Sequence, residues 1–171
     1  DLKRAGLTDE EFRQLLDITQ ATAEIAGKNL GKVFSQRISK GTRDALADTL
    51  TAIEAIEEDT PIPSMIRLRD VLARSIHHAV EDADNHEKVT PPITAWKNEW
   101  MTSDVDGAKV LKIQKALPKL RALNHIYSLY LQTMLKEEMI DYDDMIMQVV
   151  HAIEVHDDLR YDLHEKYQYI M

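Results

Sequence analysis

The sequence contains no cysteine, which excludes disulfide bonds, a cysteine-ligated zinc site and a thiol nucleophile. Glycine and proline occur only five times each in 171 residues, too rarely for a turn-rich sandwich or barrel or for repeated strand–helix loops. No apolar run is long enough to span a bilayer. Aromatic residues are sparse at 6%, whereas Ala, Leu, Met, Glu, Lys and Gln, which favour helices, are abundant. The composition therefore predicts an all-α fold and is compatible with a reducing, intracellular compartment.

Hydrophobic residues make up 44% of the chain, enough to bury a core, and their spacing predicts an irregular multi-helix domain. A capping box at Thr8–Glu11 opens the first predicted helix. Further helices are expected over about 42–56, after Ser64, after Thr94, and over about 119–138, 141–153 and 156–166.

Glycine and proline mark the predicted breaks between these helices. The stretch from Gly27 to Gly41 is expected to be an exposed loop or short helix. Residues 102–108 are expected to form an exposed loop, and Pro118 is expected to interrupt any helix around it. The chain ends on Tyr167–Met171, a segment typical of the start of a buried strand that is cut short.

The net charge of −9 disfavours nucleic-acid binding at first sight, but the basic residues are concentrated in two tracts that contain no acidic residue. The first tract holds Lys28, Lys32, Arg37, Lys40 and Arg43, and the second holds Lys109, Lys112, Lys115, Lys119 and Arg121. Contacts to phosphate need this kind of locally unopposed Lys and Arg. A solvated surface and nucleic-acid contact are equally good interpretations of the tracts taken alone.

Motifs of common enzymes are missing from the sequence: it has no glycine-rich phosphate loop, no GxSxG and no HExxH. The dipeptide His156-Asp157, with His77 or His125 upstream and Asp162 downstream, leaves open an all-α metal-dependent phosphohydrolase. A helical protein-interaction domain, whose basic tracts contact an acidic partner, is the other alternative.

An acidic cluster lies at the start of one predicted helix. Asp141, Asp143 and Asp144 fall within one turn and would suit a hard cation such as Mg²⁺. Acidic residues at a helix N-terminus are, however, stabilising without any metal. We therefore predict that they cap the helix and bind no metal.

The C-terminal half carries several motifs in order. Tyr127 and Tyr130 precede Met139–Ile146 (MIDYDDMI), and Leu159-Arg160 and the terminal YQYIM follow it. This order resembles the UvrD/Rep/PcrA family of superfamily 1 DNA helicases. In that family an aromatic-rich helix precedes an (L/I)-D-(F/Y)-D-D-(L/M) segment, and a strand then leads into the Walker B motif. The element Ile93-Thr94-x-Trp96-Lys97-Asn98 is similar to the family's I-x-x-W-K-N, so the resemblance covers about residues 91–171.

The resemblance implies that residues 1–135 are the helical insertion (1B) of the first RecA-like motor domain. Residues 136–171 would be the return helices and the start of a strand leading into the motor core. The implied function is an accessory, DNA-contacting role in an ATP-dependent 3′–5′ helicase, guiding the single strand and the duplex junction. The implied partners are this DNA and the remaining helicase domains in cis, in the cytoplasm and with no membrane. The chain opens on Asp1 and not on Met, so we expect a piece of a longer protein.

The family's Walker A loop, Walker B acids and arginine finger are missing from this sequence. We therefore expect no cofactor, metal or catalytic residue in this piece, no ATP hydrolysis by it, and ATP and Mg²⁺ in its parent. The candidate DNA-binding residues are Lys28, Lys32, Arg37, Lys40, Arg43, Lys97, Asn98, Lys109, Lys112, Lys115 and Lys119. The residues that match the family's motifs, expected to have structural roles, are Trp96, Tyr127, Tyr130, Asp141, Tyr142, Asp143 and Asp144.

Overall fold

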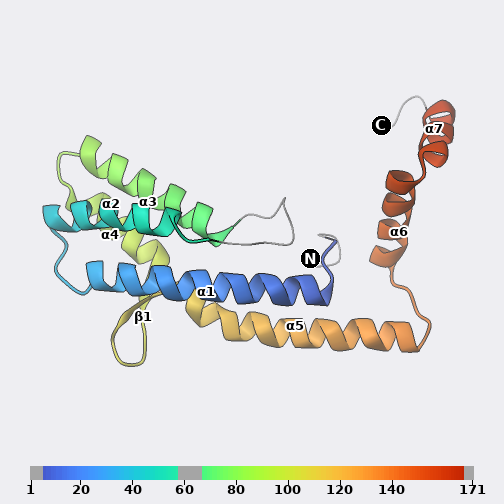
Figure 1. Ribbon diagram of the computed structural model, residues 1–171, viewed down its shortest axis with the longest axis horizontal. Helices are drawn as coiled ribbons and strands as arrows, with labels where there is room; N and C mark the ends of the chain where they lie inside the picture. The colour runs from blue at the N-terminus through green and yellow to red at the C-terminus, as the bar shows by residue number, and fades with distance from the viewer. Residues whose placement is uncertain (1–5, 58–66, 168–171) are drawn as a thin grey trace. The chain divides into compact units, whose positions relative to one another are not determined.

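The computed structural model describes residues 6–57 and 67–167, which form seven helices and one antiparallel hairpin (Figure 1). The helices are α1 (Asp9–Val33), α2 (Lys40–Glu54), α3 (Leu68–Asn85), α4 (Thr90–Trp100), α5 (Lys112–Lys136), α6 (Tyr142–Val155) and α7 (Asp157–Lys166). Strands β1 (Met101–Ser103) and β2 (Lys109–Leu111) pair with Met101 opposite Leu111. The all-α fold class is confirmed. Within the described ranges, no helix combines the length and the apolar character needed to cross a membrane.

The chain forms two compact units, which are described separately. The main unit is Arg13–Leu123, and the terminal unit combines Asp1–Phe12 with Asn124–Met171. Helices α1 and α5 each contribute residues to both units. The domain boundary expected between residues 135 and 136 remains a prediction.

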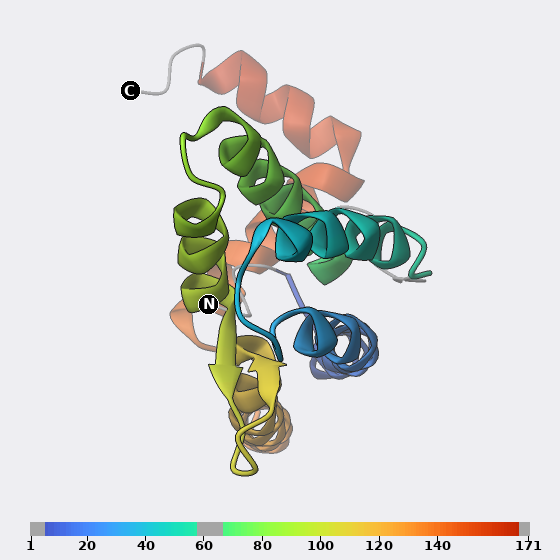
Figure 2. The ribbon, with the colours of Figure 1, turned by 90° about the vertical axis from the view of Figure 1, so that its left-hand side faces the viewer.

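The main unit has a well-packed core. Helix α2 packs on α3, α3 packs on α4, and α4 continues directly into β1 (Figure 2). The fully buried side chains of this unit include Leu30, Leu46, Ile53, Leu72, Ile76, Ile93 and Leu111. Most of them recur at helical spacing, so the apolar stripe of each helix faces the core.

Three aromatic rings join α1 to α4 within this core. The ring of Trp96 stacks on Phe34 at a centroid distance of 5.6 Å and on Trp100 at 6.3 Å. The indole Nε1 of Trp96 donates to Ser75 Oγ on α3 at 3.1 Å, which satisfies the polar atom of a side chain that is only 4% exposed. The W-K-N element therefore contributes a packed core residue.

Within the stretch from Gly27 to Gly41, expected to be a loop or short helix, residues 34–39 connect α1 to α2, but residues 27–33 belong to a continuous α1 that ends at Val33. The prediction was wrong for residues 27–33 because both glycines serve close packing. A Cβ on Gly31 would lie 2.8 Å from the backbone oxygen of Lys109, and one on Gly27 would lie 2.7 Å from Gln114 Oε1. The glycines let the hairpin and α5 approach α1, and the tertiary contacts offset their poor helix propensity.

Pro118 does not interrupt α5, which continues through it to Lys136, so this prediction was also wrong. Proline removes one backbone donor, but the surrounding residues are held by packing. Leu111 and Leu117 are buried, and the guanidinium of Arg121 donates to Asp17 Oδ1 and Gln20 Oε1, both at 2.7 Å. These contacts hold the start of α5 against α1.

One smaller expectation was wrong, and a second holds for most of its residues. Thr94 lies inside α4, where its hydroxyl donates to the carbonyl of Thr90 at 2.8 Å. The helix begins at Thr90 because the prolines that follow need no hydrogen-bond partner in a first turn. Residues 104–108 of the expected loop are exposed and form the turn of the hairpin, whereas Thr102 and Ser103 belong to β1.

The terminal unit contains the end of α5 followed by α6 and α7. The hydroxyl of Tyr127 donates to the carbonyl of Leu7 at 3.0 Å, which ties α5 to the segment before α1. Neither α6 nor α7 has a buried residue. Tyr167 follows the last residue of α7, and the remainder of the expected terminal strand, like the expected cap at Ser64, lies outside the described residues.

Candidate nucleic-acid interface

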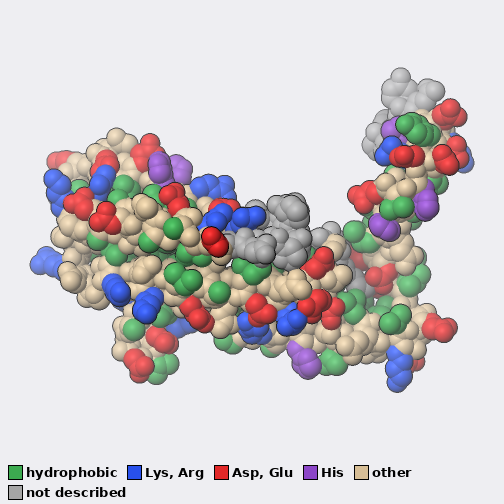
Figure 3. All heavy atoms as spheres, viewed as in Figure 1, with side chains coloured by type: hydrophobic (Ala, Val, Ile, Leu, Met, Phe, Trp, Pro, Cys, Tyr) green, Lys and Arg blue, Asp and Glu red, His purple; other side chains and the backbone are tan. Residues whose placement is uncertain are grey.

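The main unit carries a hollow of about 490 Å³ where the last turns of α1 face the hairpin. Figure 3 shows blue Lys and Arg side chains just above the hairpin, together with red acidic side chains nearby and on the hairpin itself. The hollow is lined by Glu24, Gly27, Lys28, Gly31, Lys32, Ser35, Ala108, Lys109, Val110 and Gln114. It therefore brings together lysines from both basic tracts, which are far apart in the sequence.

Two of the three lysines of this hollow are exposed, and the third is hydrogen-bonded to a neutral group. Lys28 and Lys32 are exposed on successive turns of α1. The ammonium of Lys109 donates to the neutral hydroxyl of Ser103 at 2.7 Å, across the hairpin. Within the described part of the chain, none of these three lysines forms an ion pair. The acidic group of the hollow, Glu24, accepts a hydrogen bond from Gln20 at 2.8 Å.

Two further lysines of the second tract are held on backbone carbonyls. Lys112 Nζ donates to the carbonyl of Asn98 at 2.8 Å, and Lys115 Nζ donates to the carbonyl of Ser103 at 2.5 Å. An ammonium has three donors, so each lysine keeps hydrogen-bonding capacity for a phosphate oxygen. Neutral acceptors leave the positive charge of these lysines uncompensated.

Two arginines of the tracts, Arg43 and Arg121, differ from these lysines because each is paired with a carboxylate. Arg43 on α2 forms a two-pronged ion pair with Asp84 on α3, with 2.9 Å from Nε to Oδ1, and a further contact to Asp44 at 3.2 Å. The hydrogen bond from Arg43 to Asp84 is the main cause that raises the pKa of its guanidinium. Arg121 contacts Asp17 at 2.7 Å. These pairs link neighbouring helices and reduce the charge available to a phosphate.

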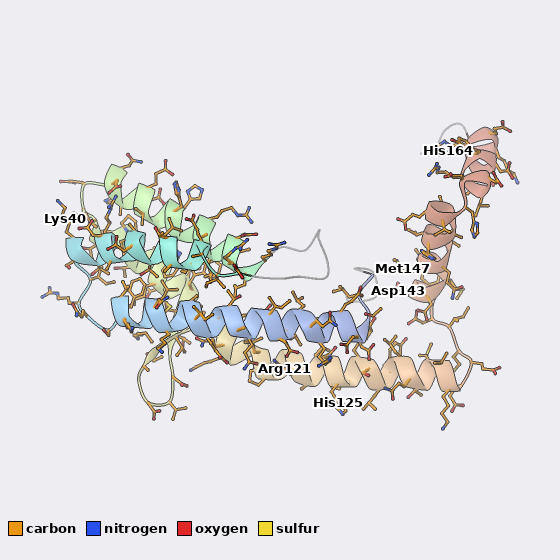
Figure 4. The ribbon with its side chains drawn as sticks, viewed as in Figure 1. Lys40, Arg121, His125, Asp143, Met147 and His164 are labelled. Carbon is orange, nitrogen blue, oxygen red and sulfur yellow. The ribbon has the colours of Figure 1, made fainter. Side chains whose placement is uncertain are left out.

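The remaining candidate residues are spread over the main unit. Arg37 is exposed between α1 and α2, Lys40 opens α2, and Lys119 is exposed on α5. On α4, Lys97 is half-buried and Asn98 is exposed. Lys40 and Arg121 lie at well-separated points of the unit (Figure 4), so the structure does not merge the two tracts into one continuous patch.

The acidic motif of the terminal unit forms a helix cap. Asp141 Oδ1 accepts the backbone N–H of Asp144 at 2.8 Å, and Asp144 Oδ2 accepts the backbone N–H of Asp141 at 3.1 Å. The hydroxyl of Tyr130 also donates to Asp141 Oδ2, which joins α5 to the start of α6. Asp143 is half-buried, and Tyr142 is 72% exposed. In the parts of the chain that the structure describes, no three His, Asp or Glu side chains gather closely enough to hold a metal ion.

The family assignment follows from the comparison with protein families. The model of the UvrD/REP helicase N-terminal domain matches residues 16–171. The chain belongs to this family. No curated protein and no solved structure matches the chain. The family match extends over most of both units and confirms the resemblance seen around MIDYDDMI, so the chain is a UvrD-type helicase fragment.

Sequence reasoning missed the hairpin that forms one wall of the hollow. A signal for it was present, because Asp106-Gly107 is a turn dipeptide between two short segments of β-compatible residues. In the structure Gly107 has a φ of 78°, and its N–H donates to the carbonyl of Asp104 at 3.0 Å.

Proposed function

We propose that this chain is the DNA-contacting accessory domain of an ATP-dependent 3′–5′ DNA helicase, where it guides the single strand and the duplex junction. The family match supports the helicase context. The observation that carries the DNA-contacting role is that lysines of both tracts line one hollow of the main unit and form no ion pair within the described residues, whereas Arg43 and Arg121 are paired with carboxylates. A protein with a net charge of −9 that keeps these lysines out of ion pairs is suited to binding a polyanion.

The contacts proposed are to the sugar–phosphate backbone. Lysine ammonium groups bind phosphate oxygens without reading the bases, so they position a strand without sequence preference. The acidic surroundings weaken the attraction, and added salt screens it further. We therefore infer weak, salt-sensitive binding by this chain, with most of the affinity supplied by the rest of the helicase.

We infer that ATP and Mg²⁺ bind outside this chain. The sequence has no phosphate-binding loop, and the described residues offer no cluster of acids and histidines for a metal ion. ATP hydrolysis is accordingly proposed for helicase domains outside this sequence, in the cytoplasm.

The terminal unit is proposed to pack on those domains in cis. Its helices expose apolar side chains that a monomeric surface rarely leaves in one region. On α6 these are Tyr142, Met145, Ile146, Val149, Val150 and Val155, between 41% and 72% exposed. Contact with the motor would bury this surface.

The test replaces five lysines by glutamate in the whole helicase: Lys28, Lys32, Lys40, Lys112 and Lys115. We expect DNA binding and DNA-stimulated ATP hydrolysis to fall, while ATP hydrolysis without DNA is retained. A matched control replaces Lys88 and Lys136, which are exposed and lie outside both tracts. Unchanged DNA stimulation in the five-lysine variant would contradict the proposed function.

A further inference from the structure

We propose that the hollow between α1 and the hairpin is a preformed seat for one phosphodiester group of single-stranded DNA, held by Lys28, Lys32 and Lys109. The inference rests on the proposed function and goes beyond it by assigning one site on the main unit. On this proposal, the other lysines of the two tracts contact neighbouring parts of the DNA and contribute less to binding.

The walls of the seat are fixed by backbone packing. Gly31 lies directly against the carbonyl of Lys109, where even a methyl group would come within 2.8 Å of the oxygen. Gln114 Oε1 accepts the backbone N–H of Leu111 at 2.9 Å and lies against Gly27. These contacts attach the hairpin to α1 and α5 before any ligand arrives, so the lysines do not have to be brought together by the DNA.

The charges of the seat lie on two facing walls. Lys28 and Lys32 are one turn apart on α1, so their Cβ atoms lie roughly 6 Å apart and both ammonium groups can reach one phosphate. Lys109 comes from the opposite wall, and its ammonium retains donors beyond the one given to Ser103. Three cations that line one hollow are suited to binding a single phosphate group.

The remaining lining favours a phosphodiester over a free phosphate ion. Gly27, Ala108 and Val110 give the walls an apolar part against which a sugar can pack. Lys28, Lys32 and Ala108 are exposed, so the hollow opens to solvent and a strand can enter and leave. A free dianion would gain more from an enclosed, fully polar site.

Glu24 limits the seat at one end. It lies one turn before Lys28 on α1 and lines the same hollow. Its carboxylate repels a phosphate, so removing its charge strengthens binding.

The experiment measures binding of a fluorescent oligothymidylate to the intact chain by anisotropy at several salt concentrations. We expect K28A/K32A to weaken binding about tenfold and to reduce the slope of log affinity against log salt by about 0.7 for each phosphate that the two lysines no longer neutralise. Glu24→Gln is expected to strengthen binding severalfold. Lys88→Ala, which removes an exposed lysine elsewhere in the main unit, is the matched control and should change neither quantity.

The outcomes are distinguishable. DNA binding that K28A/K32A and Glu24→Gln leave unchanged would overturn the seat while the proposed function survives. If millimolar inorganic phosphate displaces the DNA from the unaltered chain, the hollow is a free-phosphate site and the inference fails. An absence of DNA binding by the unaltered chain at low salt would overturn both the seat and the proposed function. Circular dichroism of each variant shows whether its fold is retained.

Discussion

Glu138 ends α5 in a backbone conformation that side chains disfavour. Its φ is 53°, in the left-handed region, and the N–H of Met139 donates back to the carbonyl of Met134 at 2.9 Å. This is the helix-ending motif in which glycine is usual. A residue with a Cβ costs roughly 1–2 kcal/mol in that conformation.

Glu138→Gly is therefore expected to raise the free energy of unfolding by about 1 kcal/mol, since it removes this cost. Glu137→Gly, one position earlier and without a positive φ, is the matched control and is expected to be destabilising. Urea unfolding of both variants measures the difference. Equal destabilisation by the two substitutions would show that Glu138 carries no backbone strain.

Glu11 is predicted to titrate at lower pH than an ordinary glutamate. The backbone N–H of Thr8 donates to Glu11 Oε2 at 2.9 Å, and the Thr8 hydroxyl donates to the same oxygen at 2.8 Å. Both hydrogen bonds lower the pKa of Glu11, and the bond from the backbone N–H has the larger effect. Because the pKa of Glu11 is lower in the folded state, its ionised carboxylate stabilises the fold at a pH above the ordinary glutamate pKa. This stabilisation is lost as the pH falls through the lowered pKa of the folded state.

Nuclear magnetic resonance titration of the Glu11 side chain measures this pKa directly. Thr8→Ala removes the hydroxyl donor, so we expect the pKa of Glu11 to rise toward its ordinary value in that variant. An unshifted titration in the unaltered chain would show that the cap does not form in solution.

At the scale of the element, two glycines in helices have opposite roles. Gly31→Ala is expected to destabilise the main unit by roughly 1–3 kcal/mol, because the new methyl group meets a backbone oxygen that cannot move freely. Gly41→Ala on α2 is the matched control, since its nearest neighbour would be Ser39 Oγ at 3.7 Å. The control is expected to be neutral or stabilising by up to about 1 kcal/mol.

Thermal unfolding of the two glycine variants decides between these expectations. If Gly31→Ala were as well tolerated as Gly41→Ala, the hairpin would not pack on α1 as the structure shows, and the walls of the hollow would not be fixed.

Helical elements were predictable where local signals agreed with the packing. The apolar spacing around Leu72 and Ile76 and the cap at Asp141 correctly placed α3 and the start of α6. Gly31 and Pro118 were misread because their local preferences oppose the helix, and contacts with residues distant in the sequence decide the outcome. No local pattern reveals such contacts.

At the scale of the whole molecule, the existence of basic tracts was predictable, but their pairing was not. The sequence shows that Lys32 and Lys109 lie in acid-free tracts, yet only the fold shows that they line one hollow. Likewise Arg43 is opposed by Asp84, a residue from a different helix. The tertiary structure therefore decides which basic residues of the tracts form ion pairs and which do not.

The exposed apolar face of α6 gives a prediction about the assembled helicase. Val149 is 58% exposed, so Val149→Lys is expected to change the stability of this chain by less than about 0.5 kcal/mol. In the whole helicase the same substitution would place a charge in the proposed contact with the motor, and we expect a clearly lower melting temperature.

Ala152→Leu changes a half-buried position of the same helix. It serves as the comparison, because its effect on stability arises within the terminal unit and does not need the motor. If the helicase with Val149→Lys had the same melting temperature as the unaltered helicase, the proposed packing of the terminal unit would be contradicted.

The central claim is that this UvrD-type helicase fragment contacts DNA through lysines that form no ion pair within the described residues. The most direct test is the equilibrium binding of single-stranded DNA to the unaltered chain as salt is raised. We predict measurable binding at low salt, with log affinity falling linearly with log salt by about 0.7 for each phosphate contacted. No binding at low salt, or an affinity that salt leaves unchanged, would contradict the account.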